Sequence, residues 1–264
     1  MTPGRRSRLV LGAWLWALAG VARALTVDIA VPDTLRPLLE RHLDAARAAR
    51  LGEPLADDEI VRLAAASAAT ARELLATEGY FSPRIEVVRG PGALLFRVDP
   101  GPRTAVASFR LSLTEGRDAP AGERGYARLR ERAERAIALV PGMPFRQADW
   151  EAAKAAALRP FAGGAHAAAR IAASAARIDP ERRRADLELV IDPGPVFRLG
   201  ELRVTGANRY PAELARRYSP LRAGAAYRPQ DLLDYQTALE SSGYYARAAV
   251  RIEPDPALAA AVPV

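Results

Sequence analysis

Leu94–Pro102 reads Leu-Leu-Phe-Arg-Val-Asp-Pro-Gly-Pro, and Leu187–Pro195, 93 positions later, reads Leu-Glu-Leu-Val-Ile-Asp-Pro-Gly-Pro. Both segments place large apolar side chains at alternate positions and end in the same four residues. Such alternation predicts a strand with one buried face, which ends where proline cannot donate to a sheet and glycine permits a turn. A copy at a fixed spacing indicates a duplicated structural unit.

The offset of 93 residues continues beyond the turn. Ala107–Leu113 aligns with Gly200–Gly206, and apolar residues alternate with other residues in both segments. Two strands around one turn, repeated without a gap, predict tandem modules of one fold.

Within the first module the chain reads strand, helix, helix, strand, strand. Thr26–Val31 alternates as a strand, and two stretches with apolar residues three or four positions apart follow as helices. The first helical face is Leu35, Leu38, Leu39, Leu43 and Ala46. The second helix is capped by Asp57 or Asp58, and its face is Ile60, Leu63, Ala64, Ser67, Ala71, Leu74 and Leu75. The predicted fold class is α+β, built of tandem β-α-α-β-β modules.

The repeat predicts three modules behind an N-terminal segment: 1–24, then 25–102, 103–195 and 196–264. Glycines are expected at the structural turns, namely Gly79, Gly101, Gly194 and Gly243. In the third module strands are expected at Gly200–Gly206 and Ala249–Glu253. At the same offset its last strand would fall after Val264, so these residues are expected to lack it. Either they are a fragment of a longer protein, which we favour, or something else contributes the strand.

The first 24 residues read as an export signal. Three arginines precede an apolar stretch from Leu9 to Ala19, and Ala22-Arg23-Ala24 supplies a small-x-small cleavage pattern before Leu25. The apolar stretch is shorter than the roughly 20 residues that a helix needs to cross a bilayer. The alternative is an uncleaved anchor.

Composition excludes several classes of function. The 264 residues include no cysteine and two histidines, so disulfide frameworks, thiol catalysis and histidine-rich metal centres are not expected. Four of the seven net positive charges are arginines in the first 24 residues, which contain no acidic residue. In the rest of the chain arginines are interleaved with acidic residues, whereas a nucleic-acid interface would concentrate basic residues on one face. We therefore expect no nucleic-acid partner, no metal and no cofactor.

Candidates for catalysis are few. His42 lies near an apolar helix face and is expected at its boundary, and His166 follows two glycines with no evident carboxylate partner. Asp179 and Asp186 are acidic candidates in the same region, but nothing in the spacing brings them within hydrogen-bonding distance of a base. Phosphate-loop, dinucleotide and serine-elbow motifs are absent. The chain is expected not to be an enzyme.

Four further segments share a glycine beside an aromatic residue or a turn, and they are Glu78–Phe81, Asp192–Phe197, Gly206–Tyr210 and Ser242–Tyr245. With the module order, they resemble polypeptide-transport-associated (POTRA) domains of the outer-membrane assembly factor superfamily. The arrangement of three modules after an export signal resembles the TamA family of this superfamily. The second module departs from the pattern, because Gly163-Gly164-Ala165-His166 replaces the glycine-aromatic step and Pro160 precedes it.

The resemblance implies a periplasmic scaffold associated with the outer membrane, whose C-terminal barrel these residues do not include. The implied partners are an inner-membrane-anchored TamB-like protein and unfolded outer-membrane protein clients, autotransporters among them. The alternatives are the POTRA region of a different assembly factor or of a two-partner secretion transporter.

The resemblance also implies that the second strand of each module is an open edge that pairs with extended polypeptide. The implied partner-binding residues are Arg84, Ile85, Glu86, Val87, Val88, Ile171, Ala173, Arg177, Ala249, Arg251 and Glu253. Charged side chains among them would discourage aggregation at these edges.

Overall fold

The computed structural model describes residues 23–52, 54–114 and 122–264. Most of the predicted signal, including Ala22, therefore lies outside the described residues. The chain divides into two compact units. The first comprises the chain up to Leu74 together with Arg84–Asp99, and the second comprises Leu75–Pro83 together with Pro100–Val264.

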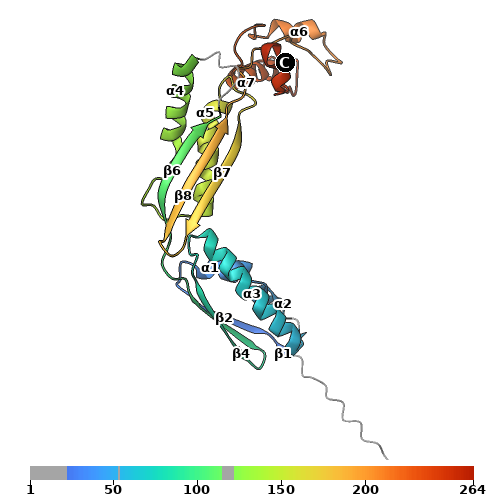
Figure 1. Cartoon of the computed structure of the whole chain (residues 1–264). Coiled ribbons are helices and arrows are strands. Elements are labelled where there is room, and N and C mark those ends of the chain that lie inside the picture. Colours follow the sequence, from blue (N-terminus) through green and yellow to red (C-terminus); the bar gives the residue numbers. More distant parts are fainter. Residues whose placement is uncertain (1–22, 53, 115–121) are drawn as a thin grey trace, which may run out of the picture. The chain divides into compact units, whose positions relative to one another are not determined.

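The first unit is a three-stranded sheet with helices on one face (Figure 1). Its elements, in chain order, are β1 Arg23–Ala24, β2 Thr26–Ala30, α1 Arg36–His42, α2 Asp44–Leu51, β3 Pro54–Leu55, α3 Asp57–Thr77, β4 Arg84–Gly90 and β5 Ala93–Asp99. The last turn of α3 belongs to the second unit. The α+β fold class is thereby confirmed, with a two-residue β1–β3 pair added to the expected order.

The last strand of the module lies in the middle of the sheet. The strand order is β2-β5-β4, with β2 parallel to β5 and β4 antiparallel to it. Leu94, Phe96 and Val98 of β5 are buried, as their alternation predicted. Burying such side chains contributes about 1.5–3 kcal/mol each, so β5 both holds the two flanking strands and supplies much of the core.

One helix was expected over Leu35–Ala46, and the structure has two. The backbone of Leu43 is extended, with φ −71° and ψ 131°, and it separates α1 from α2. A new helix start leaves backbone amides without a partner inside the helix. The Ser67 hydroxyl of α3 accepts a hydrogen bond from one of them, the Ala45 N–H, at 3.0 Å. Ser67 is fully buried, so this bond ties α2 to α3 in the core.

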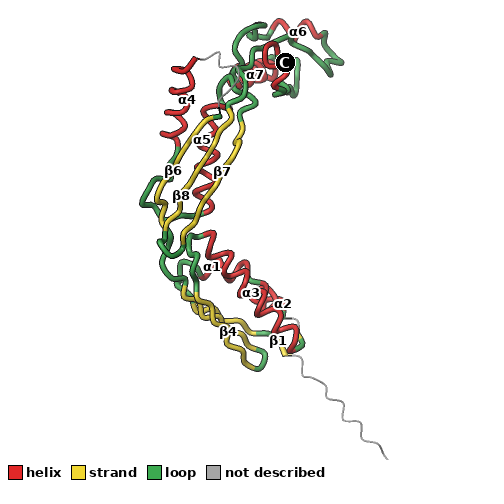
Figure 2. The backbone as a smooth tube through the Cα atoms, in the orientation of Figure 1, coloured by secondary structure: helices red, strands yellow, loops and turns green. Residues whose placement is uncertain are grey.

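The second unit contains a second sheet of the same design (Figure 2). Its module runs β6 Ala105–Leu113, α4 Gly122–Ala136, α5 Gln147–Ala162, β7 Arg170–Asp179 and β8 Arg184–Asp192. The order is β6-β8-β7, again with the last strand central, parallel to the first and antiparallel to the second. In the core the Phe109 and Trp150 rings meet edge to face at 5.7 Å. The duplication inferred from the sequence is therefore a duplication of sheet topology.

The turn Glu78–Phe81 packs inside the second unit. Gly79 has φ +91°, and a Cβ atom there would overlap the Phe145 carbonyl oxygen. The Gly79 carbonyl accepts a hydrogen bond from Thr104 N at 2.9 Å, and the Glu78 carboxylate accepts two from Arg146, at 2.9 and 3.1 Å. The glycine is needed for both its backbone conformation and this close approach.

The same contact recurs 93 residues later. Phe197 N donates to the Ala165 carbonyl at 2.7 Å, as Thr104 N does to that of Gly79. The Gly163–His166 turn departs from the sequence pattern, since no aromatic residue follows its glycines directly. It nevertheless accepts the same hydrogen bond from the segment that begins the next module. Pro160 lies inside α5 and does not end it.

Residues 196–264 differ from the expectation for a third module. They form α6 Ala212–Arg217, α7 Pro229–Ser241 and the 3₁₀ helix η1 Pro256–Ala261. The expected strands at Gly200–Gly206 and Ala249–Glu253 are wrong, since neither segment forms a regular strand. In both complete sheets the first and second strands are hydrogen-bonded to the central strand and not to each other. Here the first segment pairs with residues 262–264 through an isolated parallel bridge between Leu199 and Val262.

We predict that Ser67→Ala destabilises the first unit by about 1–3 kcal/mol, because it leaves the buried Ala45 N–H without an acceptor. Hydrogen exchange followed by mass spectrometry should show α2 and α3 amides exchanging several-fold to about a hundredfold faster. Thr70→Ala, on a less buried face of α3, is the matched control and should leave the rates unchanged or lower. Equal effects of the two substitutions would contradict the assignment.

Candidate strand-edge interface

Among the described residues, β4 is hydrogen-bonded to β5 on one side and to no strand on the other. Along it the side chains alternate: Ile85 and Val87 are half-buried, whereas Arg84, Glu86 and Val88 are exposed. Val88 is 37% exposed. The five residues predicted on this strand therefore lie together on an edge, with three of them on the solvent side. A strand paired on one side presents backbone N–H and C=O groups to a partner.

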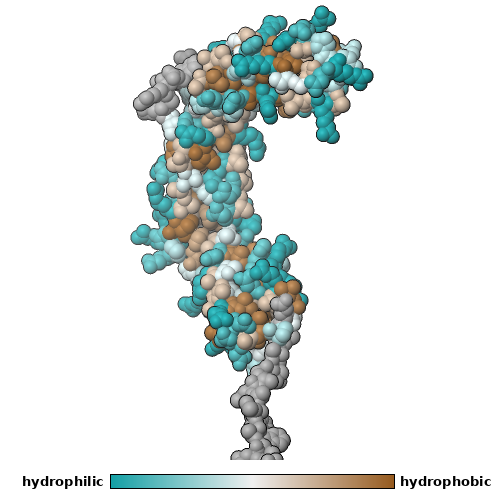
Figure 3. Space-filling model, turned by 90° about the vertical axis from the view of Figure 1, so that its right-hand side faces the viewer, coloured by the Kyte–Doolittle hydropathy of each residue, from teal (hydrophilic) through white to brown (hydrophobic). Residues whose placement is uncertain are grey.

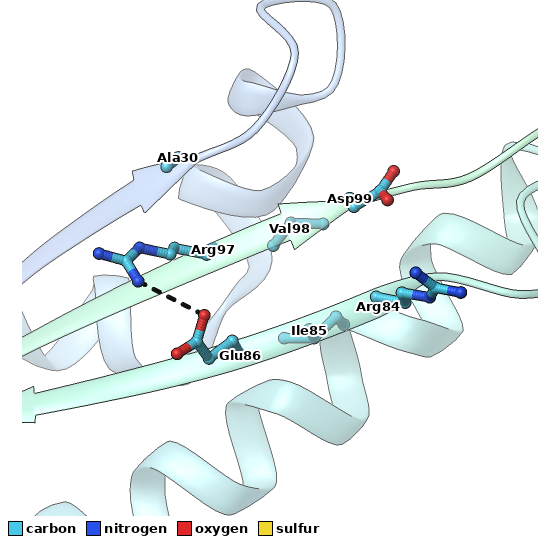
Figure 4. A pocket seen from close by; sticks show the side chains of 7 residues that line it. All are labelled: Ala30, Arg84, Ile85, Glu86, Arg97, Val98 and Asp99. Atoms are coloured by element: carbon cyan, nitrogen blue, oxygen red, sulfur yellow. Dashed lines mark hydrogen bonds and ion pairs between the residues drawn. The ribbon is translucent and has the colours of Figure 1, made fainter.

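The solvent face of the first sheet carries charges of both signs around a shallow hollow of about 400 Å³ (Figure 4). Its lining residues are Ala30, Arg84, Ile85, Glu86, Arg97, Val98 and Asp99. Glu86 and Arg97 form an ion pair at 3.5 Å across the strands, with both side chains more than half exposed. Such exposed pairs contribute about 0–1 kcal/mol, so they can rearrange at little cost when a ligand approaches.

β7 is the corresponding edge of the second sheet. The predicted residues Ile171, Ala173 and Arg177 lie on it, and the register with β8 shifts between Ile171 and Ala173. Two ion pairs to β8 flank the middle of the strand: Arg170–Asp192 at 2.6 Å and Arg177–Glu188 at 3.1 Å. Between Ile171 and Arg177 the residues are alanines and a serine. The middle of β7 therefore offers backbone with few side-chain obstacles.

Ala249, Arg251 and Glu253 were predicted on a third edge strand, and this prediction is wrong. Their backbone is irregular, and all three residues are exposed. Val250 between them is half-buried against the cluster of Ala215, Tyr235 and Leu239. The alternation therefore did indicate which residues are buried. Alternate residues can be buried, however, without the backbone hydrogen bonds of a β-sheet.

The sequence did not reveal that the first strands are edges too. β2 and β6 each pair with the central strand only. One signal was available: the strands with the most regular alternation of large apolar residues, β5 and β8, are the central ones. In β8 Ala185, Leu187, Leu189 and Ile191 are almost completely buried.

The two histidines lie apart from these edges. His42 is exposed rather than at the boundary of the core. His166 is 4% exposed, its Nδ1 lies 3.3 Å from the Gly194 carbonyl oxygen, and its ring stands near those of Tyr126 and Phe161. It has the surroundings of a structural residue that ties the α5–β7 turn to the Asp-Pro-Gly-Pro turn. Burial, with a smaller contribution from Asp192, raises the pKa of Tyr126.

On the second sheet, the Asp186 carboxylate accepts three side-chain hydrogen bonds. Arg184 donates two hydrogen bonds to its carboxylate, at 3.0 and 2.9 Å, and the Ser108 hydroxyl donates one at 2.6 Å. These bonds, that of Arg184 foremost, hold the pKa of Asp186 below its usual range. The bond from Ser108 joins β6 to β8 on the solvent face, while Asp179 lies at the end of β7 and caps the following turn by accepting from Arg182 N.

Over the described residues there is no cluster of three or more His, Asp or Glu side chains placed to hold a metal ion. No helix among them has the length and apolarity to cross a bilayer. On the face drawn in Figure 3, hydrophobic residues occupy small areas separated by hydrophilic ones. The open strand edges are thus more distinctive than any apolar patch on that face.

No protein-family model matches the chain, and no curated protein does. Among solved structures, the third to fifth POTRA domains of BamA from Haemophilus influenzae are similar at 16% identity and a TM-score of 0.49, over 92% of this chain and 94% of that one. The first three POTRA domains of Omp85 from Anabaena are similar at 11% identity and a TM-score of 0.36, over 90% and 91%. CdiB from Escherichia coli is similar at 11% identity and a TM-score of 0.29, over 66% and 28%. At these values the likeness does not by itself assign a function.

We predict that Ser108→Ala raises the pKa of Asp186 toward its ordinary value, because one of the bonds to the ionised form is lost. An NMR titration of the carboxyl carbon measures this directly. Since the folded pKa is depressed, Asp186 stabilises the fold above its unfolded pKa, and this contribution disappears as the pH falls through the folded pKa. Ser112→Ala, on the same strand, is the control. An unshifted pKa in Ser108→Ala would show that the bond does not favour the ionised form.

Proposed function

We propose that this chain is the POTRA region of an Omp85-superfamily protein and acts as a periplasmic scaffold that binds other polypeptides. The observation that carries the proposal is the sheet order in both complete modules: the second strand, β4 or β7, is paired on one side only. The export signal and the tandem repeat in the sequence support the same assignment. The similar structures named above are compatible with it.

Binding at such an edge relies on the backbone. An extended segment that adds to β4 or β7 gains main-chain hydrogen bonds, each contributing about 0.5–1.5 kcal/mol net. Backbone recognition makes little demand on the sequence of the ligand, which suits a protein that handles many unfolded clients. Arg84, Glu86 and Arg177, all exposed on these strands, discourage permanent pairing between edges.

In this proposal the chain is not an enzyme. His42 is exposed at the end of α1, and His166 is enclosed by aromatic rings and a turn. Within the described residues, the hydrogen bond of the His166 ring is to the Gly194 carbonyl rather than to a carboxylate. Binding therefore accounts for the exposed features better than catalysis does.

Within the superfamily we propose the TamA family, which handles outer-membrane proteins such as autotransporters with an inner-membrane-anchored TamB-like partner. The three-module pattern of the sequence supports this choice. The competing assignments are a different assembly factor and a two-partner secretion transporter.

Unfolded outer-membrane protein, added in a chaotrope-diluted form, should slow amide exchange in β4 and β7 by at least about tenfold and leave α3 and α5 unchanged. A photo-crosslinking residue at Val88 or Ser174 should capture the client. The matched control is the same residue at Val61, which is 45% exposed on the helical side of the first unit. Equal capture from the helix and from the strands would refute binding at the edges.

The choice of family is tested with defined partners. We expect the purified chain to co-elute with the periplasmic segment of a TamB-like protein and not with the secretion domain of a two-partner exoprotein. Co-elution with the exoprotein alone would favour the transporter, and the edge-binding proposal would stand unchanged.

A further inference from the structure

We propose that the outer edge of β6, over Ser108–Thr114, pairs with the same segment of a second copy of this chain. The two strands run antiparallel about a twofold axis at Leu111 and join two three-stranded sheets into one continuous sheet. This goes beyond the proposed use of β4 and β7, because it concerns the first strand of a module and self-association rather than binding of clients.

β6 is an edge strand with little charge. It forms the side of the second sheet opposite β7 (Figure 1). Among its nine residues Arg110 is the one charged side chain, whereas β4 and β7 carry three each. Charged residues, bulges and covering segments normally protect the edges of sheets from pairing. An edge so poor in charge is therefore expected to be covered by another strand.

The first residues of β6 are protected by other means. Val106 N donates to the Met143 carbonyl oxygen at 2.8 Å, and the Val106 carbonyl accepts from Gly142 N at 2.8 Å, so the loop before α5 occupies the edge there. The register with β8 shifts between Val106 and Ser108, and such a bulge disturbs pairing. Within the described residues, no further backbone segment is hydrogen-bonded to the outer side of Phe109–Leu113.

The hydrogen bonds to β8 define which backbone groups of β6 face outward. Thr114 N donates to the Ile191 carbonyl oxygen at 2.9 Å, and Leu113 stands opposite Ile191 in the parallel register. Successive residues of a strand direct their N–H and C=O groups to opposite sides. Phe109, Leu111 and Leu113 therefore present these groups to the open side. In the proposed pairing Phe109 of each copy faces Leu113 of the other, on both sides of a central Leu111 pair.

The side chains of these three residues lie on the core face of the sheet. Leu111 is 6% exposed, and Phe109 and Leu113 are partly buried against the same core, which includes Ala133 of α4 and Trp150 of α5. Where Phe109 meets Leu113 of the second copy, the two cores become continuous. The apolar surface that both side chains still expose is then buried, which stabilises the pairing.

The solvent face of β6 specifies the register. With Leu111 on the axis, Arg110 of one copy lies opposite Ser112 of the other, so the charged side chain faces a hydroxyl. A register centred on Arg110 would place two guanidinium groups opposite each other, which is destabilising. In its own sheet Arg110 stands beside Glu188 of β8, so its charge has an acidic neighbour. The edge is thus complementary to itself in one register.

The register is tested with engineered cysteines, because the chain has none of its own. Whole chains carrying Arg110→Cys and whole chains carrying Ser112→Cys are mixed at high concentration with a mild oxidant. These positions face each other as a non-hydrogen-bonded pair with Cα atoms about 4.5 Å apart. That separation suits a disulfide, so the mixture should form covalent dimers about tenfold faster than either variant alone. Arg110→Cys mixed with Ser108→Cys, the control for a register centred on Phe109, should show no such gain.

Charge at position 112 provides a second test, by sedimentation equilibrium of the whole chain. Ser112→Glu places a carboxylate opposite Arg110 of the second copy and should strengthen the dimer about three- to tenfold, and Ser112→Lys should weaken it by a similar factor. Ala173→Lys, on the exposed middle of β7, is the control and should leave the dimer unchanged. Amide exchange in residues 109–113 should slow as the concentration of the chain rises.

Three outcomes overturn the inference: a chain that stays monomeric at millimolar concentration, equal cross-linking in the mixed and single cysteine variants, or concentration-dependent protection of β4 or β7 instead of β6. Protection of β6 by a client in a monomeric chain would assign this edge to clients and refute the second copy. Each of these results leaves the proposed binding of clients at β4 and β7 to its own test.

Discussion

The hydrogen-bond ladders on the two sides of β5 and β8 are the constraint on which each module depends. A strand in the middle of a three-stranded sheet holds both neighbours, which are not hydrogen-bonded to each other. The same strand brings the most regular apolar alternation to the helices, as with Phe96, which is fully buried. Removing a flanking strand from this design would cost one ladder, whereas removing the central strand costs both ladders and a large part of the core.

The sequence predicted the structure best at positions where a residue type has a single structural role, such as an apolar residue in a buried strand face or a glycine in a turn. The alternation at Leu94–Pro102 and Leu187–Pro195 predicted strands that the structure places within a few residues, and glycines that must adopt positive φ, such as Gly101 and Gly194, marked the turns. Alternation reports burial of one face, but it says nothing of which strand lies beside which. For that reason the central position of β5 and β8 was not predicted, and Ala249–Glu253 was taken for a strand. The break at Leu43 was also missed, because its compensating bond comes from Ser67, far away in the sequence.

The candidate interface was also predicted only in part. Arg84–Val88 and the residues on β7 lie on edge strands, and the alternation along β4 matches the expected inward and outward positions. The ion pairs that flank the middle of β7 depend on the register with β8 and could not be read from spacing. The open edges carry charges that are largely neutralised across the strands, so a ligand meets backbone groups rather than a strong field. This balance favours weak and exchangeable contacts over tight ones.

The parallel pairing of Thr26 with Ala93 and of Ala105 with Arg184 has a consequence for how the molecule acquires its structure. The strand that comes first in each module cannot enter its sheet until the strand that comes last has been synthesised and delivered. Closing so long a loop is slow compared with forming the helices in between. During synthesis each of these two modules would therefore remain an open chain with preformed helices until its last strand is made, and its sheet would then form in one late step.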